Sequence, residues 1–386
     1  MEETKDIYQN IRPLLDSEVN ETIVQLIQDT SFRKAVEPIV KPFTWEQFTS
    51  FLLQCNSKYD FQKGVIYPIM TRLIKNTTTE MIGMGWDDIP KNESHIYISN
   101  HRDIVLDAAF FNMLLFDQQM QTTEIAIGDN LLVYHWIEKL VRLNKSFIVK
   151  RGVSVREMLK VSKHLSNYIH HTITDKNQSI WLAQREGRAK DSNDKTQTSL
   201  LKMLTLHQSS HPLQALKQLN IVPLSISYEY DPCDFLKAKE FQQKRDNPNH
   251  KKNKADDIEN MYTGMTGFKG RVHFKFGNRI NPLLDEIEAD TGRNEILKIA
   301  ANIIDNEIYR NYSFFPVNYI AYDMMTKSRK FNSKYSNKEK EEFNTYINLQ
   351  IDKVNLPQKD IEYLKNQIIA MYGNTVKNKL TITENI

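Results

Sequence analysis

The chain has few cysteines and no long apolar run, and both absences limit what it can be. Cys55 and Cys233 are the only cysteines and lie far apart, so we expect no disulfide framework and a reducing compartment. The longest apolar stretch, residues 106–116, is interrupted by Asp107 and Asn112, so it falls short of the ~20 apolar residues of a membrane helix. Residues 1–6 lack the basic and apolar regions of a signal peptide. We therefore expect a cytoplasmic protein.

A large excess of charge of one sign is also lacking. The net charge is only +3, which is too small to indicate nucleic acid as a partner. Charged residues make up 26% and hydrophobic residues 40% of the chain, as is usual for soluble globular proteins. The 386 residues suffice for one large domain with appendages or for two domains.

Glycine is missing from the first part of the chain, where none precedes Gly64. Residues 19–27 carry apolar side chains at helical spacing, and Thr44 stands three residues before Gln47, as in a helix capping box. We predict an N-terminal helical region over residues 1–80. Two roles stay open for it: a structural cap on the main domain, or contact with substrate or membrane.

From about residue 80 onward, short β patterns alternate with helical patterns. Alternation of this kind predicts an α/β fold: a mixed, largely parallel sheet flanked by helices, in a domain over residues 81–285. The ligand of such a sheet sits at the carboxyl ends of its strands. Strands are predicted at 95–99, 124–127, 146–149, 179–183 and 221–228, and helices at 104–116, 133–143, 154–171 and 198–208.

The last third of the chain departs from this alternation. Residues 231–260 are polar and without apolar periodicity, which predicts a solvated loop, and the basic segment 244–254 within it is a candidate for contact with anionic lipid. Residues 270–276 alternate and predict a late strand. Helices are predicted at 284–310 and, split at Pro357, over 338–372. Residues 286–386 are therefore expected to form a C-terminal helical region.

Polar residues follow the first predicted strand, at the mouth of the next helix. They are Asn100, His101, Asp103 and Asp107. A neutral His oriented by a carboxylate is a usual general base for a hydroxyl or an amine, and free N–H groups at a helix N-terminus can stabilise an oxyanion. The alternative is a His that only makes local hydrogen bonds at a helix cap.

Further polar, basic and glycine-containing stretches follow the other strands. Asn130 follows the second strand, and Lys150 and Arg151 end the third, where they can hold a phosphate. Glu186, Gly187 and Arg188 follow the fourth strand, and Pro223 stands near the start of the fifth. Each stretch alone is equally compatible with ordinary surface residues.

Two other chemistries are disfavoured by spacing. His101-Arg102-Asp103 also spells the catalytic-loop signature of protein kinases, but that signature needs an Asn where Ala108 stands. His207 and His211 lack the adjacent Glu of a zinc motif, so we predict no metal site.

Taken in order, these stretches resemble the sequence blocks of the glycerolipid acyltransferase family, the glycerol-3-phosphate and 1-acylglycerol-3-phosphate acyltransferases. Asn100 and His101 with a downstream Asp match the first block, and the later blocks match residues 147–152, 186–188 and 221–223. The family places four residues between the His and the Asp. Here five residues precede Asp107 and one precedes Asp103, so Asp107 ranks first but both aspartates remain candidates. The third block also carries Arg185 where many members have Pro.

The resemblance implies an acyltransferase that needs no cofactor. In the family, the His takes a proton from the acceptor hydroxyl, which attacks the thioester of acyl-CoA or acyl carrier protein directly. The implied acceptor is of the glycerol-phosphate type, in phospholipid synthesis; O- or N-acylation of amino-acid-containing lipids and a non-catalytic lipid-binding module are the alternatives. The implied catalytic residues are His101 with Asp107 or Asp103, and the implied substrate-binding residues are Asn130, Lys150, Arg151, Glu186, Gly187, Arg188 and Pro223.

An enzyme that makes lipids must reach a bilayer. We therefore expect a peripheral protein on the cytoplasmic face of an anionic membrane. The apolar helix after His101 and the basic segment around Lys251 are the docking candidates from sequence.

Overall fold

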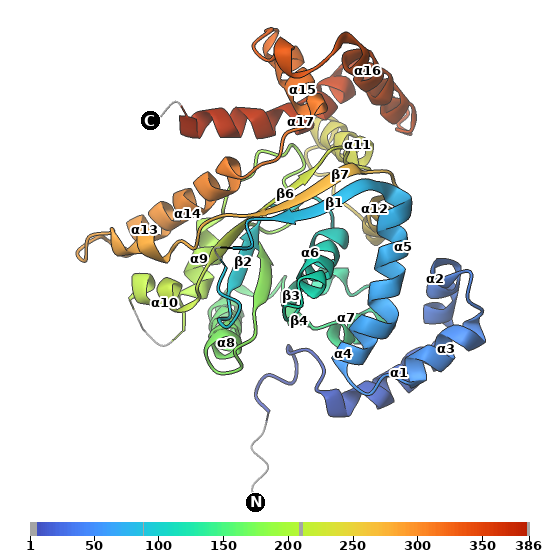
Figure 1. Cartoon of the computed structure of the whole chain (residues 1–386), viewed down its shortest axis with the longest axis vertical. Coiled ribbons are helices and arrows are strands. Elements are labelled where there is room, and N and C mark those ends of the chain that lie inside the picture. Colours follow the sequence, from blue (N-terminus) through green and yellow to red (C-terminus); the bar gives the residue numbers. More distant parts are fainter. Residues whose placement is uncertain (1–5, 88, 208–210, 384–386) are drawn as a thin grey trace, which may run out of the picture.

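The fold is built on one mixed sheet. The computed structural model describes residues 6–87, 89–207 and 211–383, and within them seven strands pair in the order β1-β7-β6-β2-β5-β3-β4 (Figure 1). β6 and β7 are antiparallel, and the other neighbouring pairs are parallel, which confirms the predicted α/β class. The strands are β1 Thr78–Met84, β2 Ile96–Ser99, β3 Glu124–Gly128, β4 Ser146–Val149, β5 Ile180–Ala183, β6 Val222–Tyr228 and β7 Gly270–Phe276.

Helices cover both faces of the sheet, and this explains why its central strands β2 and β6 are buried at every residue. Ile96 and Ile98 of β2 face one core cluster, whereas Tyr97 between them faces the other. The first face is covered by α8 Val155–Thr174, α9 Thr198–Leu204, α10 Pro212–Gln218 and α14 Arg293–Arg310, and the second by α5 Tyr67–Thr77 and α6 Leu106–Asp117 (Figure 1).

The N-terminal helices share a core of their own. Their buried side chains, such as Phe32 and Phe48, pack together and against Leu143 of α7 His135–Leu143. The predicted capping box is present, because Thr44 and Gln47 each accept a hydrogen bond from the other's backbone N–H. The helices are α1 Val19–Gln28, α2 Thr30–Val40, α3 Trp45–Leu53 and α4 Lys58–Phe61.

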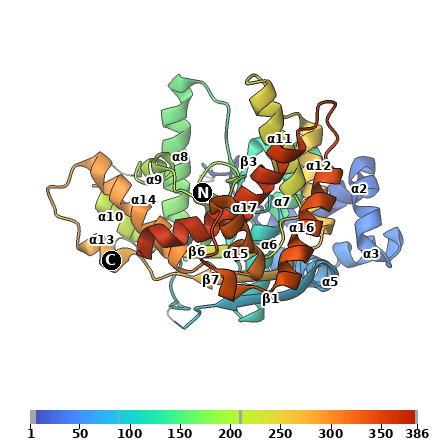
Figure 2. The ribbon, with the colours of Figure 1, turned by 90° about the horizontal axis from the view of Figure 1, so that it is seen from above.

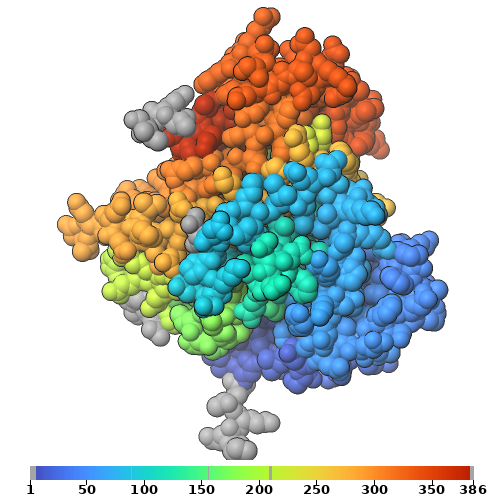
Figure 3. Space-filling view, viewed as in Figure 1, coloured from blue at the N-terminus to red at the C-terminus, as the bar shows by residue number. Residues whose placement is uncertain are grey.

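The C-terminal helices form another cluster, α15 Pro316–Thr326, α16 Asn337–Asp352 and α17 Ile361–Thr383. Figure 3 shows the C-terminal residues and the N-terminal helices gathered at opposite ends of the molecule. The predicted helix 284–310 is broken: residues 286–292 separate α13 Asn281–Asp285 from α14, which begins at Arg293. Ile296 and Ile304 of α14 pack into the core of the sheet, and α14 also contacts α17 of the C-terminal cluster.

Residues 231–260 differ from the predicted loop, because they contain α11 Asp234–Asp246 and the start of α12 Lys254–Thr266. The inward face of α11 buries the polar side chains of Lys237, Glu240 and Gln242. The sequence therefore lacks the apolar periodicity from which a helix is predicted. Asn253 caps α12 by accepting the N–H of Asp256 at 3.0 Å. Figure 2 shows α11 beside α16 and α17, whereas α12 contacts α5.

The membrane expectations change with the fold. Nine of the 12 residues of α6 are buried, so this helix does not offer the docking face expected from sequence. Across the described ranges, no helix has the length and apolar character that crossing a membrane requires.

Candidate active site

Asn100 fixes the point at which the chain leaves β2. Its side-chain amide donates to the Ile226 carbonyl and accepts the Ile226 N–H, both at 2.8 Å, so it extends the β2–β6 pairing by one step. Asn100 is fully buried. The next residue, His101, is therefore held at the carboxyl edge of the sheet.

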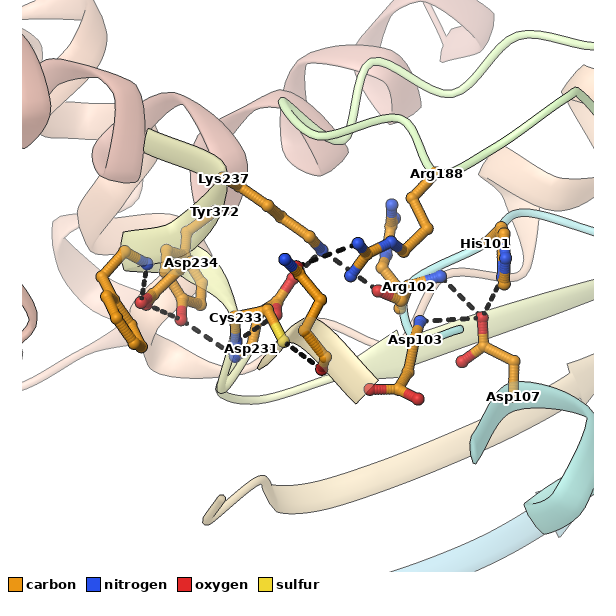
Figure 4. Close-up of polar contacts among 12 residues, drawn as sticks. His101, Arg102, Asp103, Asp107, Arg188, Asp231, Cys233, Asp234, Lys237 and Tyr372 are labelled. Carbon is orange, nitrogen blue, oxygen red and sulfur yellow. Dashed lines mark hydrogen bonds and ion pairs between the residues drawn. The ribbon is translucent and has the colours of Figure 1, made fainter. Parts of the chain in front are cut away.

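His101 is paired with Asp107 and not with Asp103 (Figure 4). His101 Nδ1 lies 2.8 Å from Asp107 Oδ2, and their side chains are 13% and 0% exposed. The Trp181 ring packs edge-on against the imidazole at 5.7 Å between centroids. The ring is thus oriented from two sides, and Nε2 is the nitrogen left for a substrate.

The turn before α6 absorbs the extra residue between His101 and Asp107. α6 begins at Leu106, so Asp107 lies in its first turn and reaches back over residues 102–105. Asp103 closes the turn by accepting the N–H groups of Val105 at 2.9 Å and Leu106 at 2.8 Å. Burial, and then the charge of Asp107, raises the pKa of Asp103.

Most N–H groups at the mouth of α6 are already used. Asp107 Oδ2 also accepts the N–H of Arg102 at 2.6 Å and of Asp103 at 3.1 Å, and Asp103 accepts those of Val105 and Leu106. The structure describes all of residues 102–106, and among their backbone N–H groups only that of Ile104 donates to neither Asp103 nor Asp107. Within this turn, the N–H of Ile104 is therefore the group left for an oxyanion.

Arg102 is anchored by a residue far away in sequence. Its guanidinium makes two hydrogen bonds with Asp194, at 3.0 and 2.6 Å, and both side chains are buried. Tyr312 donates to the same carboxylate at 2.5 Å, and Lys237 donates to the Arg102 carbonyl at 3.1 Å. The backbone next to His101 is thus held in place by side chains from later parts of the chain.

His101 lines a cavity of about 440 Å³ that is apolar on one side and charged on the other. Below, we call it the catalytic cavity. Its apolar wall comes from α6, α7 and β3, with Ile104, Val105, Ala108, Ile127, Ile137 and Val141. Its charged rim is mainly cationic and carries Arg151, Arg185, Arg188, Lys190 and Lys252 together with Glu186 and Asp257. The arrangement accommodates an apolar chain and an anionic group beside one base.

The model of the acyltransferase family matches residues 84–227. This segment belongs to the acyltransferase family. The match confirms the resemblance on which the predicted activity rests, and it covers β2 to β6 with every predicted site residue. No curated protein matches the chain. Among the solved structures to which the chain is similar is the 1-acyl-sn-glycerophosphate (LPA) acyltransferase PlsC from Thermotoga maritima, with 12% sequence identity and a TM-score of 0.35; the similarity covers 78% of this chain and 100% of that one.

The acyltransferase segment brings five of the predicted substrate-binding residues to the catalytic cavity. They are Asn130, Arg151, Glu186, Gly187 and Arg188. Arg151 Nη1 lies 3.3 Å from Glu186 Oε1, and Arg188 donates to Asn260 of α12 at 3.0 Å. Gly187 has a φ of +67°, a conformation in which a residue with a Cβ is strained.

Two predicted residues lie elsewhere. Pro223 is buried near the start of β6, opposite Ile98, so its side chain belongs to the sheet and does not line the cavity. Lys150 directly follows β4 and lines a different cavity, on the other face of the sheet. The structure therefore does not bring either of them to His101.

Several residues of the site were missed from sequence. Lys190 and Lys252 line the cavity, and both are ion-paired with Glu240, a buried carboxylate of α11. Burial lowers the pKa of Lys190 to about 8 despite that partner. In the sequence, both lysines lie in charged stretches without apolar periodicity. Such stretches do not show which side chains point into the protein.

Proposed function

We propose that this protein transfers a fatty acyl group from an acyl thioester to a hydroxyl of a phosphate-bearing acceptor in glycerolipid synthesis, with His101 as the general base. The observation that carries the proposal is the 2.8 Å pairing of His101 with Asp107 at a cavity with an apolar wall and a mainly cationic rim. Acyl-CoA and acyl carrier protein are the donors that this chemistry accepts.

The proposed reaction is a direct attack. His101 Nε2 takes the proton of the acceptor hydroxyl while the oxygen forms a bond with the thioester carbonyl carbon. The tetrahedral intermediate then collapses, the carbon–sulfur bond breaks, and the proton passes to the leaving thiolate. The products are an ester and a free thiol. Asp107 accepts the Nδ1–H and stabilises the imidazolium that forms in between.

We assign the oxyanion to two donors at the cavity. The N–H of Ile104 is left over by both carboxylates of the turn, and Ile104 lines the cavity. Arg188 Nη1 is buried and has no hydrogen-bond partner in the described part of the chain. A donor held in place before the reaction stabilises developing charge without reorganising.

The cationic rim supports an anionic acceptor. Arg151 passes close over Gly128, where a Cβ would lie 2.7 Å from Arg151 Nε. Arg151 then stands at the cavity beside Arg185 and Arg188, where a guanidinium can hold a phosphate through two parallel hydrogen bonds.

We propose that the protein works at the cytoplasmic face of an anionic membrane, to which its N-terminal helices bind. Ile39, Phe43, Phe51 and Leu53 of the α2–α3 segment are exposed, and the Phe43 and Phe51 rings contact each other at 5.5 Å between centroids. Lys34 and Lys41 are exposed in the same segment. Flotation with anionic vesicles tests this: Phe43→Ser with Phe51→Ser is expected to reduce binding, and unchanged binding would contradict it.

The activity is tested by thiol release from acyl-CoA and from acyl carrier protein. The acceptors are glycerol 3-phosphate, lysophosphatidate and lyso-amino-acid lipids, and the acylated product is identified by mass. We expect thiol release that depends on a phosphate-bearing acceptor. Product only with amino-acid lipids would contradict the acceptor class, and no product with any donor and acceptor would contradict the enzyme.

A further inference from the structure

A second cavity, of about 340 Å³, lies on the opposite face of the sheet from the apolar wall of the catalytic cavity. We call it the α8–α9 cavity, because these helices form its walls. Its apolar floor comes from both helices and from the strands below, with Phe147, Val161, Leu165, Leu182, Leu200 and Met203. His101 does not line it.

The two cavities meet where β3 and β5 part. These strands pair only at Glu124 with Ile180 and Ile125 with Trp181. Beyond that point β3 is paired with β4 and β5 with β2, so the last residues of β3 and β5 face a gap. Ala126, Gly128 and Ala183 line both cavities, and their small size leaves the gap open.

Charged side chains stand over this gap. Arg151, Arg185 and Glu186 line both cavities, and Arg151 is ion-paired with Glu186 at 3.3 Å. Both partners are partly exposed, at 33% and 67% of the side chain, so a stronger anionic partner for Arg151 can displace Glu186 at little cost. Lys150 adds a cation on the α8–α9 side alone.

We propose that the α8–α9 cavity holds the hydrocarbon chain of the acceptor, and that the acceptor is therefore a single-chain anionic lipid rather than a small water-soluble polyol phosphate. This rests on the proposed function. The donor chain occupies the catalytic cavity, along the apolar wall beside His101. The acceptor's anionic group binds Arg151 and Arg185 above the gap, its hydroxyl reaches His101, and its chain descends on the other face of the sheet.

Two valines give a matched pair of variants. Val161 of α8 lines only the α8–α9 cavity, and Val141 of α7 lines only the catalytic cavity; both are half-buried. Each is changed to Phe, so the two variants add the same volume to different cavities. Circular dichroism melting shows whether each variant is folded.

Steady-state kinetics then use lysophosphatidates with chains of different length, glycerol 3-phosphate, and a series of acyl-CoA chain lengths. Val161→Phe is expected to lower kcat/KM for long-chain lysophosphatidate by about 10- to 200-fold, the range for lost methylene contacts in a pocket, with the donor preference unchanged. Val141→Phe is expected to shift the donor preference to shorter chains and to leave the acceptor preference unchanged.

The inference is overturned if the wild-type protein acylates glycerol 3-phosphate as efficiently as lysophosphatidate, or if Val161→Phe leaves the acceptor preference unchanged. A binding measurement separates this inference from the proposed activity. Displacement of a fluorescent fatty probe by lysophosphatidate is expected with the wild-type protein and Val141→Phe but weakened in Val161→Phe. If the wild-type protein and both variants bind lysophosphatidate equally well, the assignment of the α8–α9 cavity is wrong, whether or not turnover is found. If Val161→Phe alone loses binding but no protein shows turnover, only the proposed acyl transfer is contradicted.

Discussion

Replacing Asp107 by Asn tests how the His101 pair works. The three hydrogen bonds that Asp107 accepts all end on Oδ2, from His101 Nδ1, Arg102 N and Asp103 N. Its Oδ1 is buried near the Tyr228 hydroxyl, whose pKa is raised by burial and then by the charge of Asp107 and a hydrogen bond to it. The amide oxygen of Asn can replace Oδ2 and keep all three bonds, with the new NH₂ facing the Tyr228 hydroxyl, whose oxygen can accept a hydrogen bond. The variant loses the negative charge but keeps the geometry and the tautomer.

The magnitude follows from that lost charge. A carboxylate and an imidazolium about 4 Å apart attract each other by about 4 kcal/mol at an effective dielectric of about 20. Each 1.36 kcal/mol changes a rate about tenfold, so full proton transfer in the transition state gives a loss of about 10³ in kcat, and partial transfer gives about 10². Folding should change little, because the backbone hydrogen bonds stay and the repulsion between two buried carboxylates is removed.

The assay is acceptor-dependent thiol release, with Asp103→Asn as the matched control. Asp103 is equally buried, but it caps α6, and Asn is about as good a helix cap as Asp. We expect this control to lose less than about tenfold in kcat. Equal losses in the two variants, or near-normal kcat in Asp107→Asn, would refute the pairing mechanism.

Two further predictions concern the surroundings of the pair. Asp194→Asn leaves the buried Arg102 guanidinium without a counter-charge, so denaturant unfolding should show a loss of about 3–5 kcal/mol, and a change below about 1 kcal/mol would be inconsistent with that role. Because burial lowers the pKa of Lys190 to about 8, its positive charge is lost as the pH rises through that value. The pH profile of kcat/KM for a phosphate acceptor should therefore fall above about pH 8 and be extended to higher pH in Lys190→Arg; identical profiles would exclude Lys190 from acceptor binding.

The sheet and the location of the site were predictable because their signals are local. Short apolar runs followed by polar residues gave β2 to β6 and the carboxyl edge at which His101 lies. The pairing of His101 was less certain, because spacing alone does not show how a turn absorbs one residue. The capping of α6 by Asp103, which leaves Asp107 for His101, depends on where the helix begins.

Long-range partners and polar helix faces were not predictable. Asp194 lies 92 positions from Arg102, and no sequence pattern links a buried Arg to its counter-charge. Charged residues of α11 point inward, so its sequence lacks the apolar periodicity of a helix and resembles that of a loop. The α8–α9 cavity depends on where β3 and β5 stop pairing, which is set by the register of the whole sheet.

The central claim is that His101 is the base of an acyl transfer, and one comparison tests it most directly. His171 also pairs with an aspartate, Asp175, at 2.6 Å, but it lies on α8 and lines neither cavity. Acceptor-dependent ester formation from acyl-CoA or acyl carrier protein is measured for the wild type, His101→Ala and His171→Ala. We predict a loss of about 10²–10⁴ in kcat for His101→Ala alone. Full activity in folded His101→Ala, or an equal loss in His171→Ala, would contradict the mechanism.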